Sequence, residues 1–359
     1  MEEEEKEEVK LEVKKQIKFL QRSLSVLPYS ARSLDVNRMT ILFFSVCGLD
    51  ILNSLDTALR PYEREQIIEW IYSQQVLPQH IAGPDACCGF RGGGYLGVPF
   101  DSTKHSMPVP CDTAHVAMTY TALAVLIMLG DDLSRINRSA ISRSLRNLQR
   151  EDGSFQSMPF CGENDMRFVY SASCVCHILD DWSGIDVEKA VQFIRRSQGY
   201  DYGIGQMPHL ESHGGSTFCA VASLSLMGRL DSAFSPEERR GLARWCLRRQ
   251  VTGFQGRPNK PSDTCYSFWI GASLELLGWF QYVNKEWNRG FLLSTRGKMV
   301  GGFAKWPESH PDPLHTCLGL AGLSLNGEPG LNSLDPHLTL TRRASEWMDT
   351  LHRKWRTQS

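Results

Sequence analysis

Two kinds of segment alternate along the chain. One kind is an amphipathic helix with a charged stripe, and the other is apolar on nearly every side and must therefore be buried all round. The charged segments span 64–73, 139–149, 187–197, 236–250 and 286–295, and the apolar segments span 115–129, 168–179, 217–227, 266–277 and 315–325. Ahead of them, the pattern predicts an amphipathic helix over 12–27 and a more apolar helix over 38–52.

A turn built on glycine and a large apolar residue joins the segments of each repeat. Phe155, Ile204, Phe254 and Phe303 follow such glycines at intervals of 49, 50 and 49 residues, and the longer interval after Phe90 indicates an insertion. Alternating exposed and buried helices at a fixed period predict two concentric rings. Since no run of alternating apolar residues indicates a strand, the expected fold is all-α, an α/α barrel or toroid of about six helix pairs. An open α-solenoid is the structural rival, but its repeats are shorter and lack these turns.

Composition and charge fit one large domain. With 359 residues, 42% of them hydrophobic, the chain can bury a sizeable core. We expect an acidic, frayed segment over 1–10, a single barrel domain over 11–345 and a C-terminal helix or tail over 346–359. The formal net charge of −1 gives no reason to expect nucleic acid as a partner, and no apolar run is long enough for membrane insertion. Eleven scattered cysteines without a CxxC pair are typical of reduced thiols in a cytoplasmic protein.

The starts of the apolar helices all follow a polar stretch, so they should gather at one end of the barrel. Arg257 and Lys260 stand in a proline-flanked loop beside one of these starts, where a helix N-terminus and two cations would hold a polyanion such as a diphosphate. We expect Ser262 or Asp263 to cap a helix that begins at Thr264.

Three residues at neighbouring helix starts have the side chains of a metal site. Asp263 and Cys265 precede one apolar helix, and His315 begins the next. A closed barrel would bring them together as a three-ligand zinc site with an open fourth position, which is the arrangement of a catalytic zinc. Below this mouth, the barrel lining is apolar and aromatic, with Tyr120, Phe168, Tyr170, Phe218, Phe268 and Trp269. An apolar barrel with a cationic, metal-binding mouth would suit a ligand with an apolar tail and an anionic head group.

The repeats and three motifs resemble the β subunits of protein prenyltransferases. The motifs are RPNKPSDTCYSFW (257–269), LESHGGSTFC (210–219) and PDPLHTCLGLAGLSL (311–325), and the resemblance runs from about residue 16 to the end of the last repeat. Within the family, four further segments are most similar to the type I protein geranylgeranyltransferase, the CaaX enzyme. They are RMTILFFSVCGLDILNSLD (38–56), GFRGGGYLGVPF (89–100), ENDMRFVYSAS (163–173) and VGGFAKWPESHPD (300–312).

The resemblance implies a catalytic β subunit with one Zn²⁺, bound by Asp263, Cys265 and His315. The fourth position would take the cysteine thiolate of small GTPases and similar proteins that end in CaaX, with X often Leu. Zinc lowers the pKa of a thiol, so the thiolate would be the nucleophile that accepts geranylgeranyl from geranylgeranyl diphosphate. The resemblance also implies an obligate heterodimer with a helical-repeat α subunit and a cytoplasmic location.

Matching to the family also implies roles around the metal. His213, Arg257, Lys260 and Tyr266 match positions that hold the diphosphate, and Tyr266 and Lys305 are counted with the catalytic residues. Lys305 stands where the farnesyl enzyme carries an aspartate thought to bind magnesium, so Mg²⁺ should not be required. Thr40 stands where that enzyme is expected to carry a tryptophan that shortens the pocket. The expected isoprenoid and CaaX pocket comprises Thr40, Phe44, His115, Ala117, Tyr120, Arg167, Phe168, Trp269 and Leu314.

Other functions stay open at this point. The chain could be the β subunit of a farnesyltransferase or of the Rab geranylgeranyltransferase. A terpene cyclase shares the barrel and the apolar pit, but it needs a DxDD-type proton donor or a DDxxD motif, and neither stands in a suitable place. The pairs Asp131–Asp132 and Asp180–Asp181 follow inner helices and are expected at the opposite end as turn residues. A non-catalytic scaffold would have no reason to keep the metal ligands and cations together.

Overall fold

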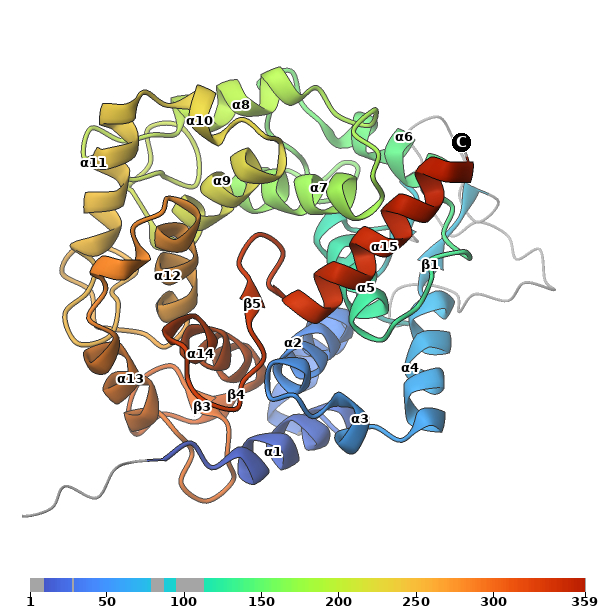
Figure 1. Ribbon diagram of the computed structural model, residues 1–359. Coiled ribbons are helices and arrows are strands. Elements are labelled where there is room, and N and C mark those ends of the chain that lie inside the picture. Colours follow the sequence, from blue (N-terminus) through green and yellow to red (C-terminus); the bar gives the residue numbers. More distant parts are fainter. Residues whose placement is uncertain (1–9, 28, 79–86, 95–112, 359) are drawn as a thin grey trace, which may run out of the picture.

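The helices form two concentric rings (Figure 1). The computed structural model describes residues 10–27, 29–78, 87–94 and 113–358. The inner ring consists of α2 (Arg38–Ile51), α5 (Val116–Met128), α7 (Met166–Ile178), α9 (Gly214–Leu226), α12 (Tyr266–Leu276) and α14 (Pro313–Asn326). The outer ring consists of α1 (Val13–Ser25), α4 (Pro61–Ser73), α6 (Arg138–Leu148), α8 (Val187–Arg196), α11 (Pro236–Leu247) and α13 (Lys285–Ser294). Each inner helix packs on the next and α14 packs on α2, which confirms the closed α/α barrel.

Burial explains why the two kinds of helix alternate. In α5, every residue except Ala117 is buried, so this helix is in contact with other parts of the protein on all sides. In α8, the buried residues are Ala190, Val191, Phe193 and Ile194, and the charged side chains lie on the opposite face. The apolar and amphipathic patterns therefore predicted the inner and outer rings correctly.

The glycine turns anchor each outer helix to the following inner helix. Phe155, Ile204, Phe254 and Phe303 are fully buried, and each forms a β-bridge with a residue one to three positions after the end of the preceding outer helix. Ile204, which departs from the usual aromatic residue, is buried to the same extent as the three phenylalanines.

The inner helix starts lie at one end of the barrel, as expected. Their first amide groups donate to the polar stretch of a neighbouring repeat: Val116 to Ser157, Met166 to Gln206, Gly214 to Gly256 and Thr264 to Lys305, at 2.8–3.0 Å. This ring of backbone hydrogen bonds places the polar residues that precede each inner helix around one rim.

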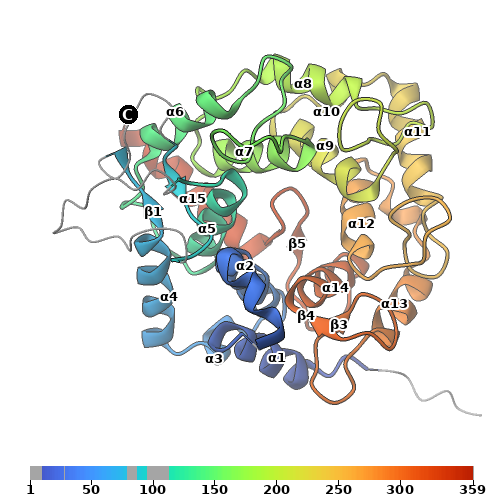
Figure 2. The same cartoon turned by 180° about the vertical axis from the view of Figure 1, so that it is seen from behind.

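A hairpin closes the opposite end. Strands β5 (Leu334–Asp335) and β6 (Leu340–Thr341) pair antiparallel, and Figures 1 and 2 show that the hairpin enters the ring. The Tyr120 hydroxyl donates to the carbonyl of Leu338 at 2.7 Å, and the Tyr170 hydroxyl donates to the carbonyl of His337 at 3.0 Å. The hairpin tip is therefore held from inside the barrel by two inner helices.

The remaining elements are short, apart from α15 (Arg342–Gln358), which continues across residue 345 and packs on α5. They are η1 (Tyr29–Asn37), α3 (Leu55–Ala58), α10 (Leu230–Ala233) and η3 (Phe280–Tyr282), and the strand pairs β1 (Gln75–Val76) with β2 (Gly89–Phe90) and β3 (Phe303–Ala304) with β4 (Pro311–Asp312). The expectation of no strands was wrong only for these two-residue ladders, which are too short to give an alternating pattern.

Two of the expectations concern residues outside those described. The acidic segment falls almost entirely on 1–9, and the insertion around 104–110 lies within 95–112. Within the described residues, none of the helices combines the length and the apolar character needed to cross a membrane. The ten cysteines in the same residues are all free thiols.

Candidate active site

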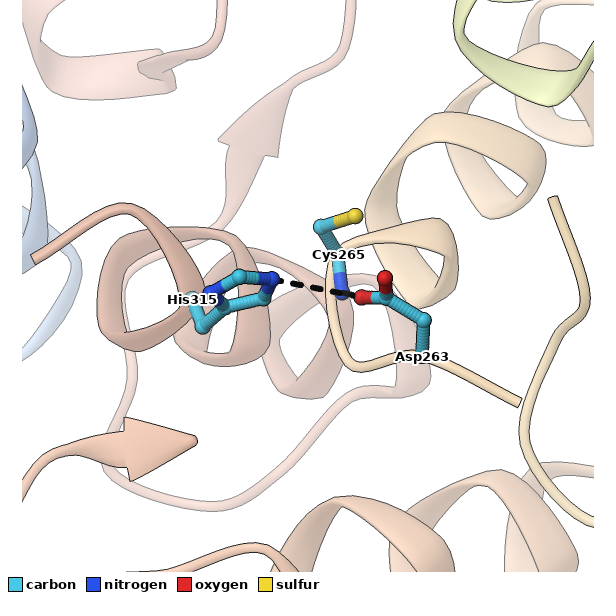
Figure 3. A group of neighbouring side chains, drawn as sticks. All are labelled: Asp263, Cys265 and His315. Atoms are coloured by element: carbon cyan, nitrogen blue, oxygen red, sulfur yellow. Dashed lines mark hydrogen bonds and ion pairs between the residues drawn. The ribbon is translucent and has the colours of Figure 1, made fainter. Parts of the chain in front are cut away.

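Three potential metal ligands converge at the rim. Asp263 and Cys265 come from the segment before α12, and His315 comes from the first turn of α14 (Figure 3). Their ligand atoms all lie within 4.8 Å of one another, and Nε2 of His315 lies 3.4 Å from Oδ1 of Asp263. Two ligands bonded to one tetrahedral zinc at 2.0–2.1 Å would be about 3.4 Å apart. The expected cluster of carboxylate, thiol and imidazole is therefore present at a spacing that fits the metal.

The local backbone explains how this cluster is built, and it corrects one expectation. Helix α12 begins at Tyr266, so the prediction that Ser262 or Asp263 caps a helix at Thr264 was wrong. Oδ1 of Asp263 accepts from the amide of Cys265 at 3.0 Å, which makes a local turn of the kind that aspartate favours. This turn holds Asp263 and Cys265 on the same side, ahead of the helix.

Asp312 orients His315, and the sequence argument did not assign this role. Asp312 caps α14 with Oδ1, which accepts from the amide of His315 at 2.9 Å, while Oδ2 lies 2.6 Å from Nδ1 of His315. A carboxylate on Nδ1 fixes the imidazole and leaves Nε2 for a metal. The signal in the sequence was an aspartate three residues before the histidine at a helix start.

The carboxylate of Asp263 affects the pKa values of both other side chains in the cluster. Burial and the neighbouring Asp263 raise the pKa of the Cys265 thiol well above its ordinary value. Burial acts to lower the pKa of His315, but hydrogen bonds to Asp263 and Asp312 outweigh it and raise this pKa to about 9. The negative charge of Asp263 contributes to both shifts in pKa, and it would equally favour a cation placed among the three side chains.

Lys305 lies next to this cluster. Its Nζ is 3.8 Å from Oδ2 of Asp263 and lies over the ring of Trp306, 4.7 Å from the centroid. Its carbonyl accepts from the amide of Thr264, so the segment after β3 that carries Lys305 is fixed to the segment that carries Asp263. The ammonium is half exposed and stands at the open side of the site.

The basic loop is one of four equivalent turns at the rim. In each, the residue after a proline has a positive φ: Phe160, His209, Asn259 and Glu308, at 60–69°. Cations flank this position in only one of the four turns, where Arg257 precedes Pro258 and Lys260 follows Asn259. Arg257 forms an exposed ion pair with Glu211 at 2.8 Å, a partner that the sequence argument missed, and Lys260 is exposed.

His213 and Tyr266 are in direct contact beside this loop. The Tyr266 hydroxyl lies 2.8 Å from Nε2 of His213, and the two rings meet edge to face. His213 also caps α9, because its Nδ1 accepts from the amides of Gly215 and Ser216. This capping role is compatible with a place in the anion site.

The expected pocket residues lie along the inner helices below the rim. Aromatic contacts link them around the ring, from Phe44 through Phe43 to Tyr120, then Tyr170, Phe218 and Trp269, with centroids 5.0–5.7 Å apart. Thr40 on α2 donates to the sulfur of Met118 on α5 at 3.3 Å. Leu314 packs against the core next to His315.

His115, Ala117, Phe168 and Arg167 lie together at the starts of α5 and α7. His115 caps α5 by accepting from the amide of Ala117, and its ring meets Phe168 at 5.7 Å. The guanidinium of Arg167 is paired with Glu163 and with the buried Asp165. A peptide carboxylate at Arg167 would therefore compete with two carboxylates that are already in place.

The structure is a helical toroid with a carboxylate, a thiol and an imidazole clustered at one rim, close to a basic loop. The chain matches the prenyltransferase alpha-alpha toroid domain over residues 11–340, and it belongs to this family.

Comparison with individual proteins shows which members of the family this chain is similar to. The chain is 41% identical to the geranylgeranyl transferase type-1 subunit beta of Dictyostelium discoideum, over 93% of this chain and 97% of the relative. It is also 41% identical to the Arabidopsis thaliana subunit of the same name, over 90% of this chain and 87% of the relative. Among solved structures, Candida albicans protein geranylgeranyltransferase-I complexed with GGPP superposes with a TM-score of 0.83 at 28% identity, covering 95% of this chain and 99% of that chain.

Proposed function

We propose that this chain is the catalytic β subunit of a type I protein geranylgeranyltransferase. The observation that carries the proposal is the cluster of Asp263, Cys265 and His315 beside the cations of the 257–260 loop, at the mouth of an apolar barrel. The similarity to type-1 beta subunits over most of both chains supports the same activity.

The donor set of the cluster fits zinc. One carboxylate, one thiol and one imidazole are ligands that zinc binds, and three protein ligands leave a position open for a substrate. A zinc ion bound here would lower the pKa of a coordinated substrate thiol and so make the thiolate available at neutral pH. Asp312 would hold His315 with Nε2 toward the metal.

The residues beside the cluster would stabilise the leaving group. When the bond between C1 of the isoprenoid and its oxygen breaks, negative charge builds on the diphosphate, and Arg257, Lys260 and the Tyr266 hydroxyl can neutralise or hydrogen-bond it. To do so, Arg257 would exchange part of its exposed pair with Glu211 for the diphosphate, which costs little because exposed pairs contribute about 0–1 kcal/mol.

Lys305 would supply a fixed positive charge where a magnesium ion is otherwise needed. Its Nζ is already within 4 Å of Asp263, on the open side of the cluster. Diphosphate departure would then not require added Mg²⁺.

Chain length would be selected by Thr40. Its hydroxyl donates to the sulfur of Met118 on α5, and its side chain is much smaller than the tryptophan expected at this position in the farnesyl enzyme. A threonine at this position is consistent with an isoprenoid of four isoprene units and not with a farnesyl-specific enzyme.

The proposal also includes the substrates and the partner subunit of this chain. The substrates would be CaaX proteins in the cytoplasm, and an α subunit would complete the diphosphate site at the rim.

Cobalt substitution tests the proposal at the metal. Co²⁺ bound to a thiolate gives a ligand-to-metal absorption band, so the heterodimer loaded with Co²⁺ should show one thiolate from Cys265. Adding a peptide that ends in CaaX should increase this band, because a second thiolate enters the open position. Absence of the first band, or no change with the peptide, would contradict the assignment. A peptide with serine in place of its cysteine is the matched control and should leave the band unchanged.

A further inference from the structure

The outer helix α1 has a row of cations on its solvent side, called here the basic face. Its members stand at intervals of four residues, so they lie on one side of the helix: Lys10, just ahead of α1, and Lys14, Lys18 and Arg22 within it. All four are exposed, and none of them forms an ion pair with another described residue. The buried residues of α1 lie on its other side. The basic face is therefore available to a negatively charged partner.

A turn with an apolar tip lies beside the basic face. It spans residues 297–302 between α13 and β3, and Lys298, Met299 and Val300 form its exposed part. Met299 is 92% exposed and Val300 is 44% exposed. Figures 1 and 2 both show the connection from α13 to α14 next to α1. The turn therefore presents two apolar side chains and one more cation to solvent at the edge of the basic face.

Polar contacts hold this turn against α1. Nζ of Lys15 donates to the carbonyl of Lys298 at 2.8 Å, and the amide of Gly302 donates to Oε1 of Gln16 at 2.8 Å. Gly301, with a φ of 79°, comes so close to the helix that a Cβ there would lie 2.3 Å from the carbonyl oxygen of Lys15. The apolar tip and the basic face are therefore parts of one surface.

The tip is specific to the last repeat. At the equivalent place, the earlier turns have an acidic pair or one apolar residue followed by a polar one: Glu151–Asp152, Tyr200–Asp201 and Val251–Thr252. Single exposed apolar residues are ordinary on protein surfaces. Two in succession beside a row of unpaired cations are the combination that binds the surface of a membrane, where apolar side chains enter the interface and cations meet anionic lipids.

We propose that the basic face of α1 and the tip at Met299 and Val300 form a docking surface for membranes that contain anionic lipids. The cations would lie among the lipid head groups, and the two apolar side chains would enter the interface. A membrane fits this surface better than an acidic protein does, because three of the four cations are lysines, whose compact charges need no partner of fixed geometry. The docking is peripheral, needs no spanning helix and is independent of the metal and diphosphate sites.

The acidic sequence ahead of α1 opposes this attraction. Residues 2–8 contain six glutamates and one lysine. A segment of seven residues can extend over about 23 Å, which exceeds the Debye length of about 8 Å in physiological salt. Its charge would therefore weaken the attraction between the basic face and anionic lipids without cancelling it. This gives the proposal a signed prediction, since removal of residues 2–8 should strengthen binding.

Sedimentation of the heterodimer with lipid vesicles tests the proposal. The probes are phosphatidylcholine vesicles with and without phosphatidylserine, and the measured quantity is the partition coefficient. The heterodimer should bind the vesicles that contain phosphatidylserine and dissociate as salt is raised. Lys14→Gln together with Lys18→Gln should lower the partition coefficient about 25-fold, at about fivefold for each cation. Absence of binding by the unchanged heterodimer would overturn the proposal.

A matched pair of variants separates the site from the net charge. Arg240 and Arg244 are exposed on the outer helix α11 with the same spacing of four residues. Arg240→Gln together with Arg244→Gln removes the same charge from another part of the surface, so it should leave the partition coefficient unchanged. Equal losses in the two pairs would mean that net charge alone attracts the vesicles, and the proposal would be wrong.

Met299→Ser tests the apolar tip. The variant should bind phosphatidylserine vesicles about tenfold more weakly, because a polar side chain replaces one that leaves water on docking. Met299→Leu should bind as the unchanged protein does. If Met299→Ser binds normally, the surface recognises charge alone, which fits an acidic protein and contradicts a membrane. Weaker binding after removal of residues 2–8 would also contradict the proposal. Prenyl transfer in solution should be unchanged in all these variants, which checks that they are folded.

Discussion

Two histidine–aspartate pairs lie at opposite ends of the barrel and have different surroundings. At the rim, Nδ1 of His315 lies 2.6 Å from Asp312, and its Nε2 faces Asp263 at 3.4 Å. At the closed end, Nδ1 of His337 lies 2.7 Å from Asp335, but its Nε2 is hydrogen-bonded to the hydroxyl of Ser225 at 3.0 Å. The first pair leaves a nitrogen beside Asp263 and Cys265, whereas the second ties the hairpin to α9. The group that contacts Nε2 of the histidine therefore distinguishes a chemical role from a structural one.

The acidic residues that follow the inner helices agree with this distinction. Asp131 accepts from the hydroxyl of Tyr72 at 2.6 Å, and Asp180 is paired with Arg356 at 2.6 Å. Asp50, in the last turn of α2, accepts from Arg343 and from Thr341. These carboxylates all have partners within the fold, and Asp131 and Asp180 follow inner helices as the sequence suggested. At the rim, by contrast, Asp263 lies beside the side chains of Cys265 and His315, so a carboxylate, a thiol and an imidazole gather at one place. This combination of side-chain types, and not the density of ionisable residues alone, distinguishes the candidate site.

The largest effect is expected from removing the thiol ligand. Cys265→Ala should lose zinc and abolish transfer while the fold remains, because Cys265 precedes α12 and alanine removes only its sulfur atom. The loss of metal affinity should exceed the 10- to 100-fold typical of a residue that only orients a ligand. Metal analysis and a transfer assay check this expectation, with Cys246→Ala in the outer helix α11 as the control. Normal activity without bound metal would contradict it.

Replacing Asp312 or Asp335 with asparagine tests the difference between the two ends of the barrel. Asp312→Asn should weaken zinc binding about 10- to 100-fold, because Nδ1 of His315 loses its carboxylate. Asp335→Asn should leave zinc affinity unchanged and should lower the free energy of unfolding by about 1–3 kcal/mol, since it weakens the bonds to His337 and Ser345. Zinc titration and urea unfolding of both variants measure the two effects. The comparison fails if both variants change zinc affinity equally.

Lys305→Asp tests the fixed positive charge. The change removes the ammonium near Asp263 and adds a carboxylate, which is a ligand that magnesium prefers. Transfer by the variant should be slow without magnesium and should rise as Mg²⁺ is added, whereas the unchanged protein should show a flat titration. A variant with a flat magnesium response would remove this role for Lys305.

The smallest effect is a pH dependence at the closed end. Although burial favours the neutral acid, hydrogen bonds from His337 and Ser345 hold the pKa of Asp335 below its ordinary value. A depressed pKa contributes stability that is present above the unfolded pKa, near 3.9, and is lost as the pH falls through the folded pKa. The stability difference between the unchanged protein and Asp335→Asn should therefore be full at pH 6 and shrink below about pH 4. Urea unfolding over this range is the measurement, and a difference that stays constant would contradict the reading.

The sequence predicted the barrel because ring position is a local property of each helix. A helix such as α5, buried on all sides, differs in composition from α8, which has a charged face, and the alternation could be read without coordinates. The β5–β6 hairpin could not be found in this way, because its strands have two residues each and their stability depends on contacts with Tyr120 and Tyr170.

The candidate site was predictable in its residue types and less so in its geometry. Asp263, Cys265 and His315 follow from equivalent positions in successive repeats, so a closed ring had to bring them together. The start of α12 was misplaced because Asp263 uses its side chain in a local turn with Cys265, and a capping aspartate has the same sequence signature. The roles of Asp312 and of the His213–Tyr266 bond depend on side-chain hydrogen bonds that no periodicity encodes.

The most direct test of the account is prenyl transfer by this chain co-expressed with an α subunit. The assay offers labelled geranylgeranyl and farnesyl diphosphate together with peptides that end in Leu or Ser, without added magnesium. The account predicts preferential geranylgeranylation of the Leu peptide. Farnesylation of the Ser peptide would contradict the roles given to Thr40 and Lys305, and the absence of any transfer would contradict the catalytic role itself.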